Sequence, residues 1–437
     1  MDISSKYFAH FRTPGPDVIK QMWRFWLDIR RVGKARELVS FIWWEINHRL
    51  LIYQFRRRYI QFTGHAGLSI TSEEASPTGD RITSSFLAEN GLVFRAVTID
   101  WKFCLQTPDS HWLGSRFSHP NGLYGSTDHS QSARLIYEFQ DPICSLFISR
   151  QQAIFVCANG VVYKSDDHGV SFRAVLHFSS SISYFLFNNG MTQLPDDTLV
   201  IGEYGSIWLG QTWQNLAFLY YSSDGGNSWE VSDFLIRQGV NKHIHLVKYS
   251  PFLQSLLLTD GDNKKQLWMN SGLADFKAKP GNSQTGWRLL TQYHHQTGGY
   301  TSMAETKESL LFGSDYLGGT NFIVRTTDGQ RFQKQVLPDP YRRSPVMNMV
   351  TRQSSSGVEV WAASYSCLSA DARSLIMCTR DSGKTWTRVL EFDGTKNEVR
   401  FVSSSPDGSE DLYLSITEFR GPSATPCHRV YKLERTL

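Results

Sequence analysis

The 437-residue sequence has few of the features that mark membrane spans, zinc knuckles or nucleotide-binding loops. No stretch approaches about 18 uninterrupted apolar residues, and the longest candidate, 38–55, contains Glu45 and Arg49, so no bilayer-spanning helix is expected. The six cysteines form no CxxC pair, which argues against a zinc knuckle or a dense disulfide framework. Neither a GKS/T loop nor a strand-linked GxGxxG motif is present, which disfavours nucleotide chemistry.

The beginning of the chain also lacks the pattern of a secretion signal. Residues 1–17 have no charged segment followed by an apolar run and a small-residue cleavage site, which predicts a cytoplasmic protein with reduced cysteines. The charge is unevenly spread, because residues 1–60 hold 12 Lys and Arg against 5 Asp and Glu while the whole chain carries only +4. The remainder is therefore slightly acidic, which disfavours a nucleic-acid partner.

The basic N-terminal segment has the pattern of amphipathic helices. Between residues 17 and 61 there is no proline and one glycine, Gly33, and apolar residues recur three or four positions apart. We therefore expect a helical, aromatic-rich extension over residues 1–65. Three interpretations of residues 17–60 are open: contact with an anionic membrane surface at the inner membrane face, contact with a partner protein, or packing on the chain's own main domain.

A short motif recurs in the rest of the chain: Ser or Thr, any residue, Asp, any residue, Gly, two further residues and an aromatic ring. Complete copies contain Asp167, Asp224 and Asp381, and a copy one residue shorter contains Asp328. In such a hairpin the carboxylate accepts amide protons of the turn, Gly supplies a backbone with positive φ, and the ring opens the return strand. We therefore interpret the four aspartates as structural.

This motif resembles the Asp-box, or BNR, repeat of sialidase-like β-propellers. Its aspartates are separated by 57, 104 and 53 residues, where 104 is two units of 52, and a degenerate copy stands at Asp128. The resemblance implies an all-β fold over residues 66–437, a seven-bladed or alternatively six-bladed propeller closed by strands from both ends of that region. Residues 92–97 are expected to supply an outer strand of the closing blade.

In such propellers the aspartate turns lie on one face, so we expect any chemistry on the other. There, neighbouring blades are expected to bring Glu203 and Tyr204 towards His243 and His245. The two histidines are two positions apart on a strand, so their side chains share one face. With Glu203 they would form a base with an orienting carboxylate, a divalent-metal site, or a hydrogen-bonded polar lining. No other cofactor is expected.

Further polar residues are expected on the same rim as candidates for substrate binding: Arg116, Asp262, Asp315, Tyr316, Tyr365, Arg400 and Glu418. They do not reproduce a sialidase active site. The Phe-Arg-x-Pro signature occurs only at 11–14, ahead of the expected helices, and the rim offers two arginines where sialidases use three. The resemblance therefore covers the fold rather than the active site.

Two functions from different classes are compatible with these patterns. The leading hypothesis is a carbohydrate-active propeller, a glycoside hydrolase or polysaccharide lyase acting on a bacterial-type surface polysaccharide or lipid-linked glycan. Glu203 would be its acid/base, with Tyr204, His243 and His245 completing the centre. The alternative is a non-catalytic scaffold or assembly factor that binds a glycan or a protein at a membrane surface.

Overall fold

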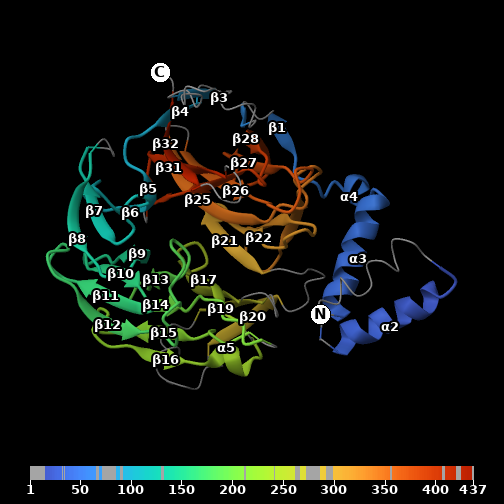
Figure 1. Ribbon diagram of the computed structural model, residues 1–437, viewed down its shortest axis with the longest axis horizontal. Coiled ribbons are helices and arrows are strands. Elements are labelled where there is room, and N and C mark those ends of the chain that lie inside the picture. Colours follow the sequence, from blue (N-terminus) through green and yellow to red (C-terminus); the bar gives the residue numbers. More distant parts are fainter. Residues whose placement is uncertain are drawn as a thin grey trace. The chain divides into compact units, whose positions relative to one another are not determined.

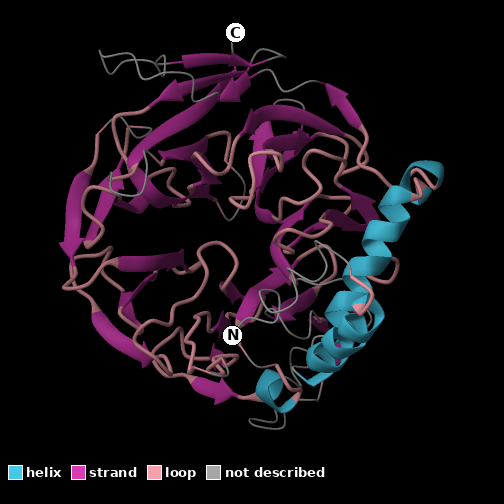
Figure 2. Cartoon of the chain, turned by 45° about the vertical axis from the view of Figure 1, so that its right-hand side comes forward, coloured by secondary structure: helices cyan, strands magenta, loops and turns pink. Residues whose placement is uncertain are grey.

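The computed structural model divides the chain into two units. Described are residues 15–31, 33, 35–64, 68–70, 85–88, 92–128, 132–210, 213–240, 242–260, 266–271, 286–291, 299–354, 357–405, 409–419 and 425–435. Among the described residues, the first unit ends at Arg57 and the second begins at Arg58. The described part of the first is helical, and that of the second consists mainly of β-strands (Figure 2).

The first unit contains helices α2 (Val18–Arg31), α3 (Ala35–Arg49) and α4 (Ile52–Phe55). Gly33, with a φ of 74°, separates the two long helices in a conformation that glycine adopts without strain. The ring of Tyr53 on α4 packs against Trp44 on α3 with centroids 5.5 Å apart, which fixes the short helix against the long one. In the part of the chain that the structure describes, no helix is both long and apolar enough to cross a lipid bilayer.

The second unit is a seven-bladed β-propeller, and this confirms the fold expected from the repeat (Figure 1). Blades 1 to 3 are formed by β5 (Trp101–Gln106), β6 (Trp112–Arg116), β7 (Gly122–Ser126) and β8 (Arg134–Glu138); β9 (Ile143–Ile148), β10 (Ile154–Ala158), β11 (Val161–Ser165) and β12 (Arg173–His177); and β13 (Met191–Gln193), β14 (Leu199–Gly202), β15 (Leu219–Ser222) and β16 (Glu230–Ser232). A short helix, α5 (Phe234–Arg237), follows blade 3.

Blades 4 to 6 repeat the same antiparallel order. They are formed by β17 (Ile244–Ser250), β18 (Ser255–Asp260), β19 (Leu267–Asn270) and β20 (Trp287–Thr291); β21 (Tyr300–Glu305), β22 (Leu310–Ser314), β23 (Phe322–Thr326) and β24 (Gln333–Val336); and β25 (Val346–Ser354), β26 (Gly357–Ser364), β27 (Ser374–Thr379) and β28 (Trp386–Phe392). Two strands from near the start of the unit, β1 (Phe62–Gly64) and β2 (Leu68–Ile70), pair in parallel with β28.

Blade 7 combines strands from distant parts of the sequence. It is formed by β29 (Asn397–Phe401), β31 (Leu412–Glu418), β32 (Cys427–Arg435), β4 (Leu92–Ala96) and β3 (Ser85–Ala88). Its strand β4 pairs antiparallel with β32, and the two-residue strand β30 (Ser403–Ser404) pairs with β5 of blade 1. These pairings join the first and last blades, so the ring has no open seam between them.

The core lies between the blades rather than at one centre. Buried apolar side chains form clusters that each join two neighbouring blades, for example Phe155 of blade 2 with Ile201 of blade 3. The rings that open the return strands contribute to this packing, because Phe172 contacts Tyr137 of blade 1 with centroids 4.8 Å apart. Each blade therefore stabilises the next through apolar burial.

The strand order defines two faces of the propeller. Because each blade is antiparallel, the loops from first to second strand and from third to fourth strand lie at one edge of the sheet. We call this the turn face. The loops from second to third strand, and from each fourth strand to the next blade, lie at the opposite edge, which we call the loop face.

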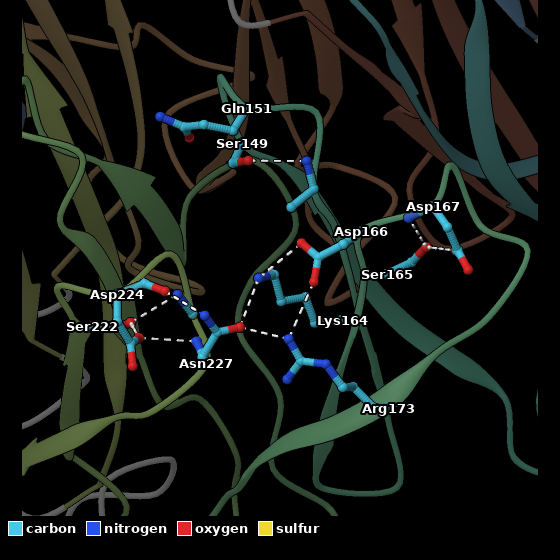
Figure 3. A network of polar contacts seen from close by, with 12 residues as sticks. Ser149, Gln151, Lys164, Ser165, Asp166, Asp167, Arg173, Ser222, Asp224 and Asn227 are labelled. Carbon is cyan, nitrogen blue, oxygen red and sulfur yellow. Dashed lines mark hydrogen bonds and ion pairs between the residues drawn. The ribbon is translucent and has the colours of Figure 1, made fainter.

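Hydrogen bonds at the turn face explain the repeated motif (Figure 3). In blade 2, Ser165 Oγ donates to Asp167 at 2.7 Å, as Figure 3 shows. The amide of Ser171 donates to the same carboxylate at 2.9 Å. Corresponding bonds hold Asp128, Asp224 and Asp381. At Asp328, where the turn is one residue shorter, the carboxylate accepts the amide protons of Gln330 and Arg331. The carboxylates thus replace missing backbone partners within the hairpins.

Candidate functional site

Glu203 follows directly after β14 and is fully buried in blade 3. One carboxylate oxygen accepts a hydrogen bond from Tyr220 Oη at 2.8 Å, and the other accepts one from Ser179 Oγ. Ser179 lies in the connection from blade 2, so the carboxylate links two blades. Burial, and after it the charge of this carboxylate, raises the pKa of Tyr220, so the phenol remains protonated and donating.

Tyr204, His243 and His245 come together on the loop-face side of blades 3 and 4. The ring centroids of Tyr204 and His243 are 4.1 Å apart, and Tyr204 also packs edge-on against Tyr184 at 5.2 Å. The two imidazoles contact each other through their Nε2 atoms at 3.0 Å. Both histidines are buried, so this cluster is a packed group of rings.

The contacts of His243 determine which nitrogens carry protons. Its Nδ1 lies 2.5 Å from the carbonyl oxygen of Gly205, which can only accept, so Nδ1 is the donor. In the neutral ring Nε2 then carries the lone pair. The hydrogen bond between the two Nε2 atoms therefore requires His245 Nε2–H to donate to His243. Two neutral imidazoles in different tautomers satisfy this geometry.

The structure does not place the Glu203 carboxylate with the histidines. Its oxygens are bonded to Ser179 and Tyr220, while Tyr204, the next residue, packs on the imidazoles. Neighbouring side chains along a strand point to opposite sides, which accounts for this separation. Among the residues that the structure describes, no group of three His, Cys, Asp or Glu side chains could hold a metal ion.

The two arginines expected on the rim, Arg116 and Arg400, each donate a hydrogen bond to a carboxylate. Arg116 Nε donates a hydrogen bond to Asp100 at 2.7 Å. Burial of Asp100 raises the pKa of its carboxyl, but the hydrogen bonds from Arg116 and Ser118 have the larger combined effect, so the pKa is lowered. Arg400 Nε donates to Glu398 at 2.7 Å. Tyr365 lies within the electrostatic influence of that pair, and its burial, followed by the charge of Glu398, raises its pKa. Both arginines are thus tied to carboxylates within the propeller.

The other expected rim residues lie on separate blades. Asp315 and Tyr316 begin the loop after β22, where the amide of Tyr316 donates to Asn321 at 2.8 Å. Glu418 ends β31 in blade 7. Asp262 lies outside the described residues. Within the predicted set, Tyr204 and the two histidines therefore form one compact cluster, and Tyr365 lies within the electrostatic influence of Arg400.

A concentration of exposed apolar side chains at the loop face was not predicted from the sequence. In the described part of the propeller, eleven large apolar residues are exposed, and eight of them lie in loops or strand ends at the loop face. The eight are Ile182, Trp208, Leu209, Trp213, Leu317, Met347, Leu368 and Phe419. Their signal in the sequence is a large apolar residue among Gly, Ser and Asp, as in "SIWLGQ", "DYLGG" and "SCLSAD".

The structure gives defined contacts for exposed side chains in two places at the loop face. Trp208 and Trp213 form an edge-to-face pair with centroids 5.1 Å apart, and the ammonium group of Lys242 lies 4.6 Å from the Trp213 ring. In blades 5 and 6, the loop at Gly318 lies against Leu368: a Cβ at that glycine would meet Leu368 Cδ1 at 3.0 Å. The exposed Leu317, next to Gly318, and the exposed Leu368 thus belong to loops of neighbouring blades that meet at Gly318, and we call this place the apolar area.

Comparison with known proteins adds support for the fold. A streptogramin B lyase structure matches with a TM-score of 0.50 and 14% identity, over 79% of this chain and 97% of that one. A chain of a mitotic checkpoint complex (TM-score 0.49, 11% identity, 83% and 100% covered) and YCF48 bound to a D1 peptide (0.47, 13%, 79% and 100%) are also similar. No protein-family model and no curated protein matches the sequence. At 14% identity the likeness to the streptogramin B lyase shows the propeller fold alone.

Proposed function

We propose that this propeller is a non-catalytic scaffold that binds a protein partner through its loop face. The observation that carries the proposal is the gathering of eight of the eleven exposed large apolar side chains at that face. Large exposed apolar patches mark interaction sites on folded proteins, and the eight side chains include Trp, Phe and Met, which are enriched in the cores of such interfaces. The hydrogen-bonded aspartate turns support assigning the scaffold to the Asp-box propellers.

The position of Glu203 favours a scaffold over a hydrolase. A general acid/base must reach the proton that it transfers, whereas this carboxylate is fully buried and occupied by Ser179 and Tyr220. Its two partners come from different blades, which gives it a role in joining them. The rings of Tyr204 and His243 likewise pack against each other.

The test compares variants on the two faces. Leu317→Asp combined with Leu368→Asp places charges in the apolar area, while Val170→Asp places one at an aspartate turn, where Val170 is 78% exposed. We expect a protein recovered by cross-linking and affinity purification from native extracts with the wild type and with Val170→Asp. Its recovery should fall about tenfold or more with the loop-face variant. Equal recovery with all three proteins would contradict the proposal.

A second candidate function is glycan binding at the Trp208/Trp213 pair. Two exposed tryptophans with the cation Lys242 over the Trp213 ring offer apolar surface and a positive charge to an anionic saccharide, and the same loop carries Tyr204. Titration with acidic oligosaccharides should then give binding that Trp208→Ala weakens and that Val231→Ala, an exposed control on β16, leaves unchanged. Release of new sugar ends by the wild type, abolished in Glu203→Gln, would instead support the hydrolase hypothesis.

A further inference from the structure

The helical unit has a surface of its own that the proposed function of the propeller does not use. On α3 the exposed large apolar side chains recur at helical spacing and form one stripe: Val39, Ile42, Trp43 and Ile46, followed by Leu50 just after the helix. The polar side chains of Ser40, Glu45 and Asn47 are buried instead. This helix therefore buries Trp44 together with polar side chains and leaves a stripe of large apolar side chains exposed.

Helices α2 and α4 also carry exposed large apolar side chains. None of the residues of α2 is buried, and its exposed apolar side chains Ile19, Met22 and Trp23 lie three or four positions apart. At the end of α4, Phe55 is 89% exposed and is followed directly by Arg56 and Arg57. Each of the three helices thus exposes at least one aromatic ring.

The charges around these stripes are almost all positive. Among residues 15–57 whose side chains are described, the exposed cations are Lys20, Arg24, Arg30, Arg31, Arg49, Arg56 and Arg57. Asp17 is the one exposed carboxylate in that set. Asp28 is ion-paired with Arg31 at 3.5 Å, and Glu45 is buried. The exposed surface therefore combines apolar rings with a net positive charge.

We propose that the helical unit docks on an anionic phospholipid bilayer, with its outward apolar stripes in the headgroup and upper acyl region. Tryptophan and phenylalanine rings favour that interface, and arginines bind lipid phosphates while their aliphatic stems lie along the apolar layer. The excess of cations selects a negatively charged surface. A water-soluble protein partner would satisfy the apolar stripes but would not require this uniform charge.

The experiment measures co-flotation of the full chain with vesicles of two compositions. One is phosphatidylcholine alone, and the other is phosphatidylcholine with phosphatidylglycerol at roughly three to one. We expect binding to the mixed vesicles at least about tenfold tighter than to the neutral ones, and weaker binding as salt is raised. Vesicles with brominated acyl chains should quench the tryptophan fluorescence of the wild type. The same vesicles should quench the fluorescence of a Trp23→Ser/Trp43→Ser variant less.

Charge-reversal variants distinguish lipid binding by the helices from lipid binding by the propeller. Arg56→Glu/Arg57→Glu should weaken binding to the mixed vesicles by about tenfold or more, while Arg134→Glu/Arg331→Glu, at exposed positions of the propeller, should bind as the wild type does. Near-ultraviolet circular dichroism verifies that each variant keeps its fold. Equal binding to both vesicle types, no binding to either, or loss only with the propeller variant would overturn the proposal. Absence of lipid binding together with a protein captured through α3 would assign the stripes to a protein partner.

Discussion

The hydroxyl of Tyr220 donates a hydrogen bond of 2.8 Å to the buried carboxylate of Glu203. With Ser179 on the other oxygen, protein hydroxyls take the place of the water that would otherwise solvate this charge. The pair therefore belongs to the packing between blades 2 and 3. Removal of the Tyr220 hydroxyl should lower the free energy of unfolding.

Tyr220→Phe should lower the free energy of unfolding by about 1.5 to 3 kcal/mol, because a hydrogen bond to a buried charge is lost. The neighbouring Tyr221 provides the matched control, since its hydroxyl donates at 2.9 Å to Glu230, an exposed residue. Tyr221→Phe should cost about 0.5 to 1 kcal/mol, because water can replace the lost donor. Denaturant unfolding of both variants measures the difference, and equal losses would contradict the role assigned to Glu203.

Acid should destabilise the propeller through its aspartate turns. Hydrogen bonds from Ser171 and then Ser165 lower the pKa of Asp167 from 3.8 to about 2, and bonds from Ser228 lower that of Asp224. Because the carboxyls have lower pKa values in the folded chain than in the unfolded one, their stabilisation is complete above pH 3.8 and is lost as pH falls towards about 2.

The check is the midpoint of thermal unfolding as a function of pH. In Asp167→Asn/Asp224→Asn the midpoint should fall less steeply below pH 3.8 than in the wild type, because two titrating turns are absent. Val170→Ala, at an exposed position of the blade 2 turn that does not titrate, should keep the wild-type slope. An unchanged slope in the turn variant would show that other groups govern acid unfolding.

The fold could be predicted from the sequence because its signal is local. The motif needs only an aspartate, a glycine and a ring within a few residues, and the turn amides bond Asp167, Asp224 and Asp381 as the motif predicts. The contacts of the site depend on side-chain direction and on neighbouring blades. Nothing near Glu203 in the sequence indicates that Ser179 and Tyr220 would bind its carboxylate.

The two adjacent glycines of the blade 3 turn should differ sharply in their tolerance of alanine. Gly225 has a φ of 71° and open space where a methyl group would lie, whereas Gly226 has a φ of 85° and a Cβ there would meet Phe155 at 2.5 Å. Gly225→Ala should cost about 1 to 2 kcal/mol for its left-handed backbone. Gly226→Ala should cost about 1 to 3 kcal/mol more, because the methyl group overpacks the blade interface. Urea unfolding of the two variants compares them directly, and similar losses would contradict the packing argument.

The histidine pair yields a prediction that does not depend on function. The carbonyl of Gly205 requires Nδ1–H on His243, and the 3.0 Å contact then requires Nε2–H on His245. Long-range proton–nitrogen correlation spectra of protein labelled at histidine should show one ring of each tautomer, identified by their disappearance in His243→Asn and His245→Asn. An Nε2–H tautomer at His243 would contradict the assignment. His245→Phe should cost about 1 to 3 kcal/mol, since it leaves the buried Nε2 acceptor of His243 without its donor.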